Sequence, residues 1–413
     1  MRLGLSLMNG PGMKLRTLLF WLHLAAGVSA GVVILIMSVT GVLLAYERQL
    51  IEWSDSGYRS IPRAAGSERL SIERLLARAE EQRRGHRPAT ITLRADSDAP
   101  AAVVLGQATL YQDVYSGDLL GEPSTGVRAA MSQLRGWHRW LALGGEQRAV
   151  GKSISGWANL LFLFILLSGM YLWIPRRRGW ANFRAVVFFR PGLGGKARDY
   201  NWHNVVGIWC AIPLILIVAC ATPISFPWAN ALVYRIVGET VPPPAGANRR
   251  QTQSVARHAD GLDALWARAE QHVTDWRSIS LRLPGTTDES AVFAIDSGTG
   301  GQPQRRSTLT LDTRTGSVVR WEPFASQSPG RRLRSWTRFT HTGEYYGVIG
   351  QTVAGLVSGG AVVLACTGLA LAFRRFFGKS VRSAAHVAQG EAQVRGESQP
   401  DAASSAARVW SGS

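Results

Sequence analysis

The chain has 413 residues, of which 46% are hydrophobic, a formal net charge of +18 and three cysteines. The cysteines lie within long apolar stretches, which excludes a disulfide framework or a CxxC metal site in the polar segments. The positive charge does not indicate a nucleic-acid-binding protein, because many basic residues flank apolar segments instead of clustering on a soluble face.

Four apolar stretches are long enough to cross a bilayer, which takes about 20 residues. The first is far longer than the roughly 7 to 15 residues of a cleavable signal's apolar core, so we expect it to remain in the mature protein. We predict transmembrane helices over residues 15–46, 153–175, 200–228 and 345–373.

Basic residues next to these helices predict the orientation, since Lys and Arg are retained on the cytoplasmic side. They precede the first helix, fill the loop 176–199 through Arg176, Arg177 and Arg178, and follow the fourth helix. We therefore expect both termini in the cytoplasm, with an N-terminal segment 1–14 and a largely disordered tail 374–413. The two long segments between helices face the exported side.

The exported segments repeat each other. IERLLARAEEQRR (72–84) matches LDALWARAEQHVT (262–274), and ITLR (91–94) matches ISLR (279–282). A helical periodicity followed by alternating strands predicts a helix and then strands in each copy.

Each copy also contains a hairpin-turn signal, Asp113 with Gly117 and Asp312 with Gly316. We expect a membrane protein with four transmembrane α-helices and two repeated α+β domains, over 47–133 and 229–332. The segments that lead back to the membrane match as well. LRGWHRW lies in 134–152 and LRSWTRF in 333–344.

The LDTRTGSVV strand, the placement of the histidines and the order of the helices resemble the PepSY-associated transmembrane helix family, over residues 15–377. The first copy departs from the pattern, with YSG where the second has RTG. The resemblance implies a bacterial inner-membrane protein with periplasmic PepSY-like domains. The chain is similar to reductases that deliver electrons to iron, often iron held by siderophores.

Four of the eight histidines lie close to membrane ends. His23 and His203 are near the cytoplasmic ends of the first and third helices, and His138 and His341 near the exported ends of the second and fourth. Each taken alone could simply hydrogen-bond at the interface beside the tryptophans of an aromatic belt. Four at positions that the repeat relates favour a functional role, because ionisable groups at membrane depth are rare and imidazole is a common metal ligand.

Two imidazoles at each membrane face suit the axial positions of a haem iron. We predict two b-type haems, one between His23 and His203 and the other between His138 and His341; a diagonal pairing stays open. Zinc is disfavoured, because structural zinc takes four ligands and catalytic zinc three.

Other residues fit this prediction. Gly27 and Gly207 lie one turn from His23 and His203, where a missing side chain either admits a porphyrin edge or allows helix packing. Arginines at the exported site could bind haem propionates bidentately or contact lipid phosphates. They are Arg135, Arg139, Arg334 and Arg338.

With the resemblance, these features predict a ferric reductase that passes electrons to a periplasmic ferric siderophore or other ferric complex and releases Fe(II). The chain has no dinucleotide fingerprint, so a separate cytoplasmic reductase or quinol would donate the electrons. One alternative is a membrane-anchored PepSY module that inhibits a peptidase or senses a ligand without a redox centre. Another is a transporter, for which only Pro213 and Pro223 hint at a broken helix.

Overall fold

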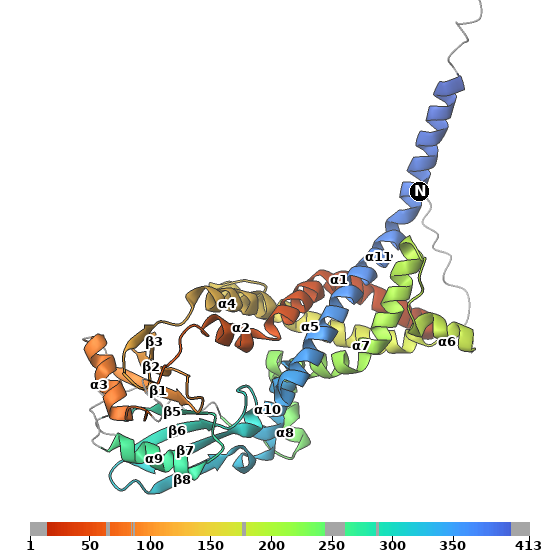
Figure 1. Ribbon diagram of the computed structural model, residues 1–413. Helices are drawn as coiled ribbons and strands as arrows, with labels where there is room; N and C mark the ends of the chain where they lie inside the picture. The colour runs from red at the N-terminus through yellow and green to blue at the C-terminus, as the bar shows by residue number, and fades with distance from the viewer. Residues whose placement is uncertain are drawn as a thin grey trace, which may run out of the picture.

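The computed structural model describes residues 15–62, 67–83, 85, 87–175, 179–243, 261–285 and 289–397. It has two parts, a bundle of long helices and an eight-stranded sheet that carries its own helices (Figure 1). The predicted segment 1–14 and Arg176, Arg177 and Arg178 lie outside the described residues, as do residues 398–413 of the predicted tail.

Among the residues that the structure describes, four helices are long and apolar enough to cross a membrane, so the chain is a multi-pass membrane protein. The shortest has 26 residues and therefore a length of about 39 Å, more than the roughly 30 Å of hydrocarbon. Helices α1 and α7 each pack against both α5 and α11. The bounds are α1 (Leu15–Leu44), α5 (Arg148–Trp173), α7 (Gly195–Ser225) and α11 (Gly347–Glu397).

Helix α7 is continuous through Pro213 and Pro223. The sequence hint of a broken helix is therefore not realised in the structure. Helix α11 continues past residue 373, so that part of the predicted tail is helical as far as Glu397.

Shorter helices join the bundle to the sheet, and we call this side of the bundle the sheet end and the opposite side the far end. Helices α2 (Glu47–Ser54) and α8 (Pro227–Ile236) follow α1 and α7. Helices α4 (Thr125–Trp140) and α10 (Pro329–His341) lead back into α5 and α11. The remaining short elements are α6 (Trp180–Val187) at the far end and the 3₁₀ turns η1 (Gly145–Gln147), η2 (Pro303–Arg305), η3 (Phe324–Ser326) and η4 (Glu344–Tyr346).

The two copies of the repeat form one antiparallel sheet with the strand order β4-β3-β2-β1-β5-β6-β7-β8, where two α+β domains were predicted. The first copy supplies β1 (Pro88–Arg94), β2 (Ala101–Leu105), β3 (Ala108–Gln112) and β4 (Leu119–Gly121). The second supplies β5 (Ser278–Arg282), β6 (Ser290–Asp296), β7 (Arg306–Asp312) and β8 (Val318–Pro323). In two separate sheets, β1 and β5 would be edge strands with unpaired backbone groups. Pairing β1 with β5 satisfies the backbone hydrogen bonds of both strands.

The β1–β5 junction is self-complementary. Thr92 and Ser280, which are equivalent in the repeat, lie opposite each other with their hydroxyl oxygens 2.8 Å apart. Beside the junction, Glu73 and Asp263 are also equivalent and exchange contacts: the backbone N–H of each donates to the carboxylate of the other, at 3.1 and 3.4 Å. Such reciprocal contacts are what a two-fold axis produces. The two copies are therefore related by a local two-fold axis through the centre of the sheet.

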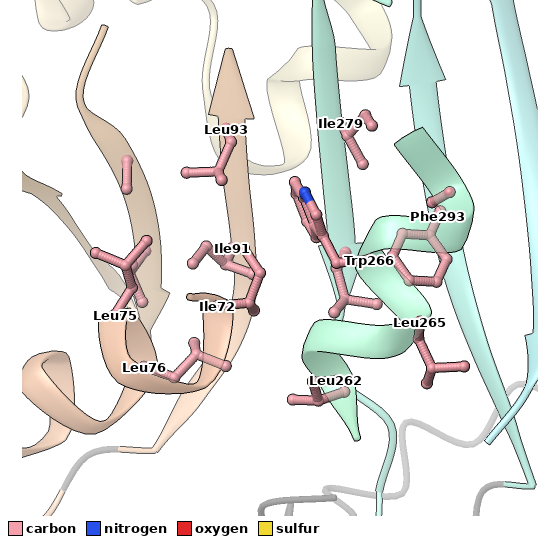
Figure 2. Close-up of a cluster of buried hydrophobic side chains, with 14 of the residues drawn as sticks. Ile72, Leu75, Leu76, Ile91, Leu93, Leu262, Leu265, Trp266, Ile279 and Phe293 are labelled. Carbon is pink, nitrogen blue, oxygen red and sulfur yellow. The ribbon is translucent and has the colours of Figure 1, made fainter. Parts of the chain in front are cut away.

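One hydrophobic core serves both copies. Helices α3 (Ile72–Gln82) and α9 (Leu262–His272) cover the same face of the sheet, and Figure 2 shows their apolar side chains directed at the central strands. Leu75, Ile91 and Phe293 are fully buried, and Trp266 of α9 packs edge-on against Phe293. The sheet and its two helices therefore constitute a single folded unit.

Both predicted hairpin turns are confirmed. Asp113 Oδ1 accepts hydrogen bonds from two backbone N–H groups of its turn, and Asp312 Oδ1 does the same in the second copy. Gly117 and Gly316 adopt φ of 74° and 67°, the left-handed region that favours glycine.

A polar cluster ties α2 and α4 to the first copy of the sheet, and it makes stability depend on pH. Asp55 accepts hydrogen bonds from Arg128, from the Ser124 backbone N–H and from the Tyr111 hydroxyl. Burial raises the pKa of Asp55, but these donors outweigh it and leave the pKa below its usual value of 3.8.

We expect Asp55→Asn to lower the free energy of unfolding by about 1–3 kcal/mol at pH 7, because a carboxylate that accepts charged hydrogen bonds is lost. The contribution of a group with a lowered folded pKa is present above its unfolded pKa and disappears as pH falls through the folded pKa. Denaturant unfolding of the wild type and the variant between pH 7 and pH 3 should therefore show two stabilities that converge at the acid end. A constant difference across this range would contradict the assignment.

Candidate functional site

At the far end of the bundle, His23 of α1 and His203 of α7 line one cavity of about 900 Å³. Nδ1 of His23 lies 2.9 Å from Oγ of Ser168 on α5, and Nδ1 of His203 lies 3.0 Å from Oγ1 of Thr367 on α11. Each histidine is thus held by the neighbouring helix of its own copy.

The hydroxyl partners decide which ring nitrogen carries the proton. Ser168 donates to the carbonyl of Phe164, and Thr367 to that of Val363, each at 2.7 Å. A hydroxyl has a single hydrogen to donate, so towards the imidazole it acts as the acceptor of an Nδ1–H. This assignment, made from the hydrogen-bond network, leaves the lone pair of each histidine on Nε2. Metal-binding histidines have this arrangement, with the second ring nitrogen fixed by a protein acceptor.

Two glycines lie directly against these rings. A Cβ added to Gly169 would lie 3.3 Å from Cε1 of His23, and a Cβ added to Gly368 would lie 3.3 Å from Cε1 of His203. The sequence analysis did not identify the four residues 168, 169, 367 and 368. Their signal is a Ser-Gly in the second span and a Thr-Gly in the fourth, at the spacing of the repeat.

Gly27 and Gly207 also line the cavity. A Cβ on Gly27 would meet nothing within 4 Å, so its missing side chain faces open space and not a neighbouring helix. A Cβ on Gly207 would lie 3.7 Å from Cδ2 of Leu364, an ordinary contact. The helix-packing interpretation therefore does not fit Gly27.

Basic residues lie at the same cavity, and the sequence analysis used the basic residues next to the spans only as markers of orientation. Arg16 donates to the carbonyls of Leu172 and Ile174 at 2.6 and 2.8 Å. The guanidinium of Arg375 lies 4.8 Å above the Trp21 ring. With Lys196, these side chains give the cavity a cationic rim that suits anionic groups such as carboxylates.

At the sheet end, His138 of α4 and His341 of α10 lie together, with ring centroids 6.1 Å apart and ring planes at 42°. Two imidazoles on one metal, each bonded at about 2 Å, have their ring centres about 6 Å apart. The structure thus brings the histidines together in pairs within each end of the bundle and not diagonally.

The sheet-end rings are oriented like the far-end rings. Nδ1 of His138 lies 3.0 Å from Oγ1 of Thr40, which donates to the carbonyl of Ile36 at 2.7 Å. Nδ1 of His341 donates to the carbonyl of Ile217 at 3.0 Å. In all four histidines Nδ1 is therefore the donor and Nε2 holds the lone pair.

His138 and His341 belong to helices outside the four spans. Burial lowers the pKa of His138 to about 4, and repulsion from His341 and Arg139 acts in the same direction. Burial also lowers the pKa of His341. Among the described residues, no three His, Cys, Asp or Glu side chains converge as a metal site, so each end offers two protein ligands.

The predicted repeat relation holds for one pair only. His23 and His203 are equivalent, but aligning LRGWHRW with LRSWTRF places Thr337 opposite His138. Thr337 is buried and donates to the carbonyl of Arg334. His341 lies about one helical turn after Thr337, the position that the repeat matches to His138. The sheet-end pair therefore joins two positions that are not equivalent in the repeat.

The four predicted arginines fall into two classes. Arg135 forms an ion pair with Glu47, and Arg334 donates to Asn230 at 2.6 Å. Arg139 and Arg338 are exposed and form no ion pair within the described part of the chain. Partial desolvation of its side chain lowers the pKa of Arg139, and repulsion from Arg148, Arg338 and Arg135 lowers it further. The positive charge at the sheet end is therefore largely uncompensated.

Comparison with known proteins gives a family match. The profile described as the PepSY-associated TM region matches residues 20–405. The matched region contains both copies of the repeat and all four of these histidines. A search of curated proteins finds no match to the chain.

Proposed function

The chain belongs to the PepSY-associated TM region family, and on this basis, together with the two histidine pairs, we propose that it carries electrons across a membrane to ferric iron. His23 and His203 would hold one b-type haem, and His138 and His341 a second. The acceptor would be a ferric siderophore or another ferric complex on the sheet side. The chain would then act as a ferric reductase.

One observation carries this proposal: all four imidazoles present Nε2 and have Nδ1 fixed by an acceptor. An interface histidine needs no such uniform orientation, whereas a ligand pair does. Gly27 supports the far-end site, because its open side is turned to the cavity.

The chain's own residues have defined tasks in this proposal. The histidines supply two neutral nitrogen ligands at each end, and the hydroxyls of Thr40, Ser168 and Thr367 hold the rings in the binding tautomer. Arg16 and Arg375 would neutralise propionates at the far end. Each haem iron, when bound, supplies a one-electron redox centre.

The net reaction needs a donor that the chain does not contain. A quinol would give two electrons and two protons, and two ferric ions would take one electron each to become Fe(II). A cytoplasmic flavoprotein reductase could deliver the same electrons. The basic far-end loop supports an orientation in which that side would lie in the cytoplasm and the sheet in the periplasm of a bacterial inner membrane.

The absorption spectrum of the purified chain, oxidised and then reduced with dithionite, tests the proposal. We expect sharp α and β bands on reduction and close to two b-type haems per chain in a pyridine assay. A colourless protein, from cells supplied with haem, would refute the electron carrier. It would favour a PepSY module that binds or regulates a partner without a redox centre.

A further inference from the structure

Between α4 and α5 the chain reverses through a turn that ordinary residues rarely adopt. Leu141 and Ala142 have φ of 53° and 59°, in the left-handed region, although neither is glycine. Such strain persists where the surroundings enforce it, and it concentrates at functional sites. Here Ser155 donates to the carbonyl of Arg139 at 2.8 Å, and Gly151 packs against Trp140 with no room for a Cβ.

The enforced turn places two guanidinium groups on one aromatic ring. The guanidinium carbon of Arg148 lies 3.6 Å from the ring centre of Trp140, and that of Arg139 lies 4.8 Å from it. Stacking on an aromatic face restrains the planar group, so less freedom is lost when it binds an anion. Both groups are exposed and available to solvent.

A third arginine extends the cluster from the second copy. Arg338 of α10 stacks on Phe339 at 5.4 Å, and it is among the charges that repel Arg139. In the described part of the chain, none of Arg139, Arg148 and Arg338 forms an ion pair with a carboxylate. Like charges held together without a counter-ion are costly, and an anion bound between them removes that cost.

We propose that Arg139, Arg148 and Arg338 form a docking site for a small anionic iron(III) chelate, one that presents carboxylate oxygens. Guanidinium groups recognise carboxylates bidentately, and Arg139 directly follows His138 in the chain. The choice of an iron chelate rests on the proposed function, because it takes iron(III) as the electron acceptor. We favour a small ligand over a lipid phosphate because the three arginines come from both copies, and Arg148 and Arg338 are both close enough to Arg139 to repel it.

Isothermal titration calorimetry tests the site without depending on haem. The probe is iron(III)–EDTA, a monomeric anion, and the neutral tris(acetohydroxamato)iron(III) complex is the charge control. We expect Arg148→Gln to weaken binding of the anionic chelate roughly tenfold or more, since a hydrogen bond to a charged group is lost. Arg148→Lys should recover part of the affinity, and the neutral complex should respond to neither change.

Arg320→Gln is the matched control variant, because Arg320 lies on edge strand β8 and pairs with Glu322 on the same strand. Arg148 was not a candidate for the propionates, so its replacement leaves haem content unchanged. Equal affinity in Arg148→Gln and the wild type would overturn the docking site. The docking site would also be overturned if the wild type bound the chelate in detergent but not in phosphatidylglycerol nanodiscs. That result would assign the arginines to lipid phosphate. A protein that binds the chelate but no haem would refute the proposed function and retain the anion site.

Discussion

Replacing His203 with alanine should remove one haem of two and leave the other, and replacing His23 should remove the same one. The physical reason is that, in the proposed function, His23 and His203 would be the two protein ligands at the far end, where both rings line one cavity. His138→Ala and His341→Ala should each remove the other haem, because their rings lie 6.1 Å apart. Haem per chain, with the reduced spectrum and the two midpoint potentials, identifies which haem is lost.

His272→Ala is the matched control for these variants. His272 lies at the end of α9, edge-on against Trp321 of the sheet and away from both pairs. Its replacement should leave two haems per chain. If His23→Ala and His203→Ala removed spectroscopically different haems, the pairing within each end of the bundle would be wrong.

Replacing Gly27 with leucine should abolish haem binding at the far end while the bundle stays folded. A side chain at residue 27 would enter the cavity, because nothing lies within 4 Å of its Cβ position. Glycine is a poor helix former, so leucine is not expected to destabilise α1 through its backbone. Haem content should fall to about one per chain, with the sheet-end haem retained, as measured by the pyridine assay and by thermal unfolding.

Gly359→Leu provides the comparison for this variant. Gly359 is also a glycine within a spanning helix, and a Cβ there also meets nothing within 4 Å, but it does not line the cavity. It should keep two haems. Two haems in Gly27→Leu would contradict the assignment of the cavity, and equal loss in both variants would indicate a general effect of leucine on the bundle.

The spanning helices and the family could be predicted because their signals are local. A run of about 20 apolar residues is visible at any position in a chain, and the predicted family is confirmed by the match over residues 20–405. The hairpin turns at Asp113 and Asp312 were predictable for the same reason, since Asp and Gly at fixed spacing define the turn.

The joining of the two copies could not be predicted from these patterns. The β1–β5 pairing depends on which strand edges remain free after each copy folds, and an edge strand and a central strand can have the same alternation. Likewise, the sequence singled out His23 but not its partner Ser168, because the Ser-Gly and Thr-Gly pairs of the two copies gain meaning only once each is known to lie against a histidine. Arg148 was missed because its place on Trp140 follows from the left-handed turn at Leu141 and Ala142.

The reciprocal junction at Thr92 and Ser280 has a consequence for the history of the fold. Two identical chains that each carried one copy would pair their strands about a two-fold axis in the same way. Here both copies belong to a single chain. A homodimer can alter its two equivalent positions only together, since one gene encodes both. Once the copies are fused, each can change alone, and the unmatched His138 and His341 are such a divergence.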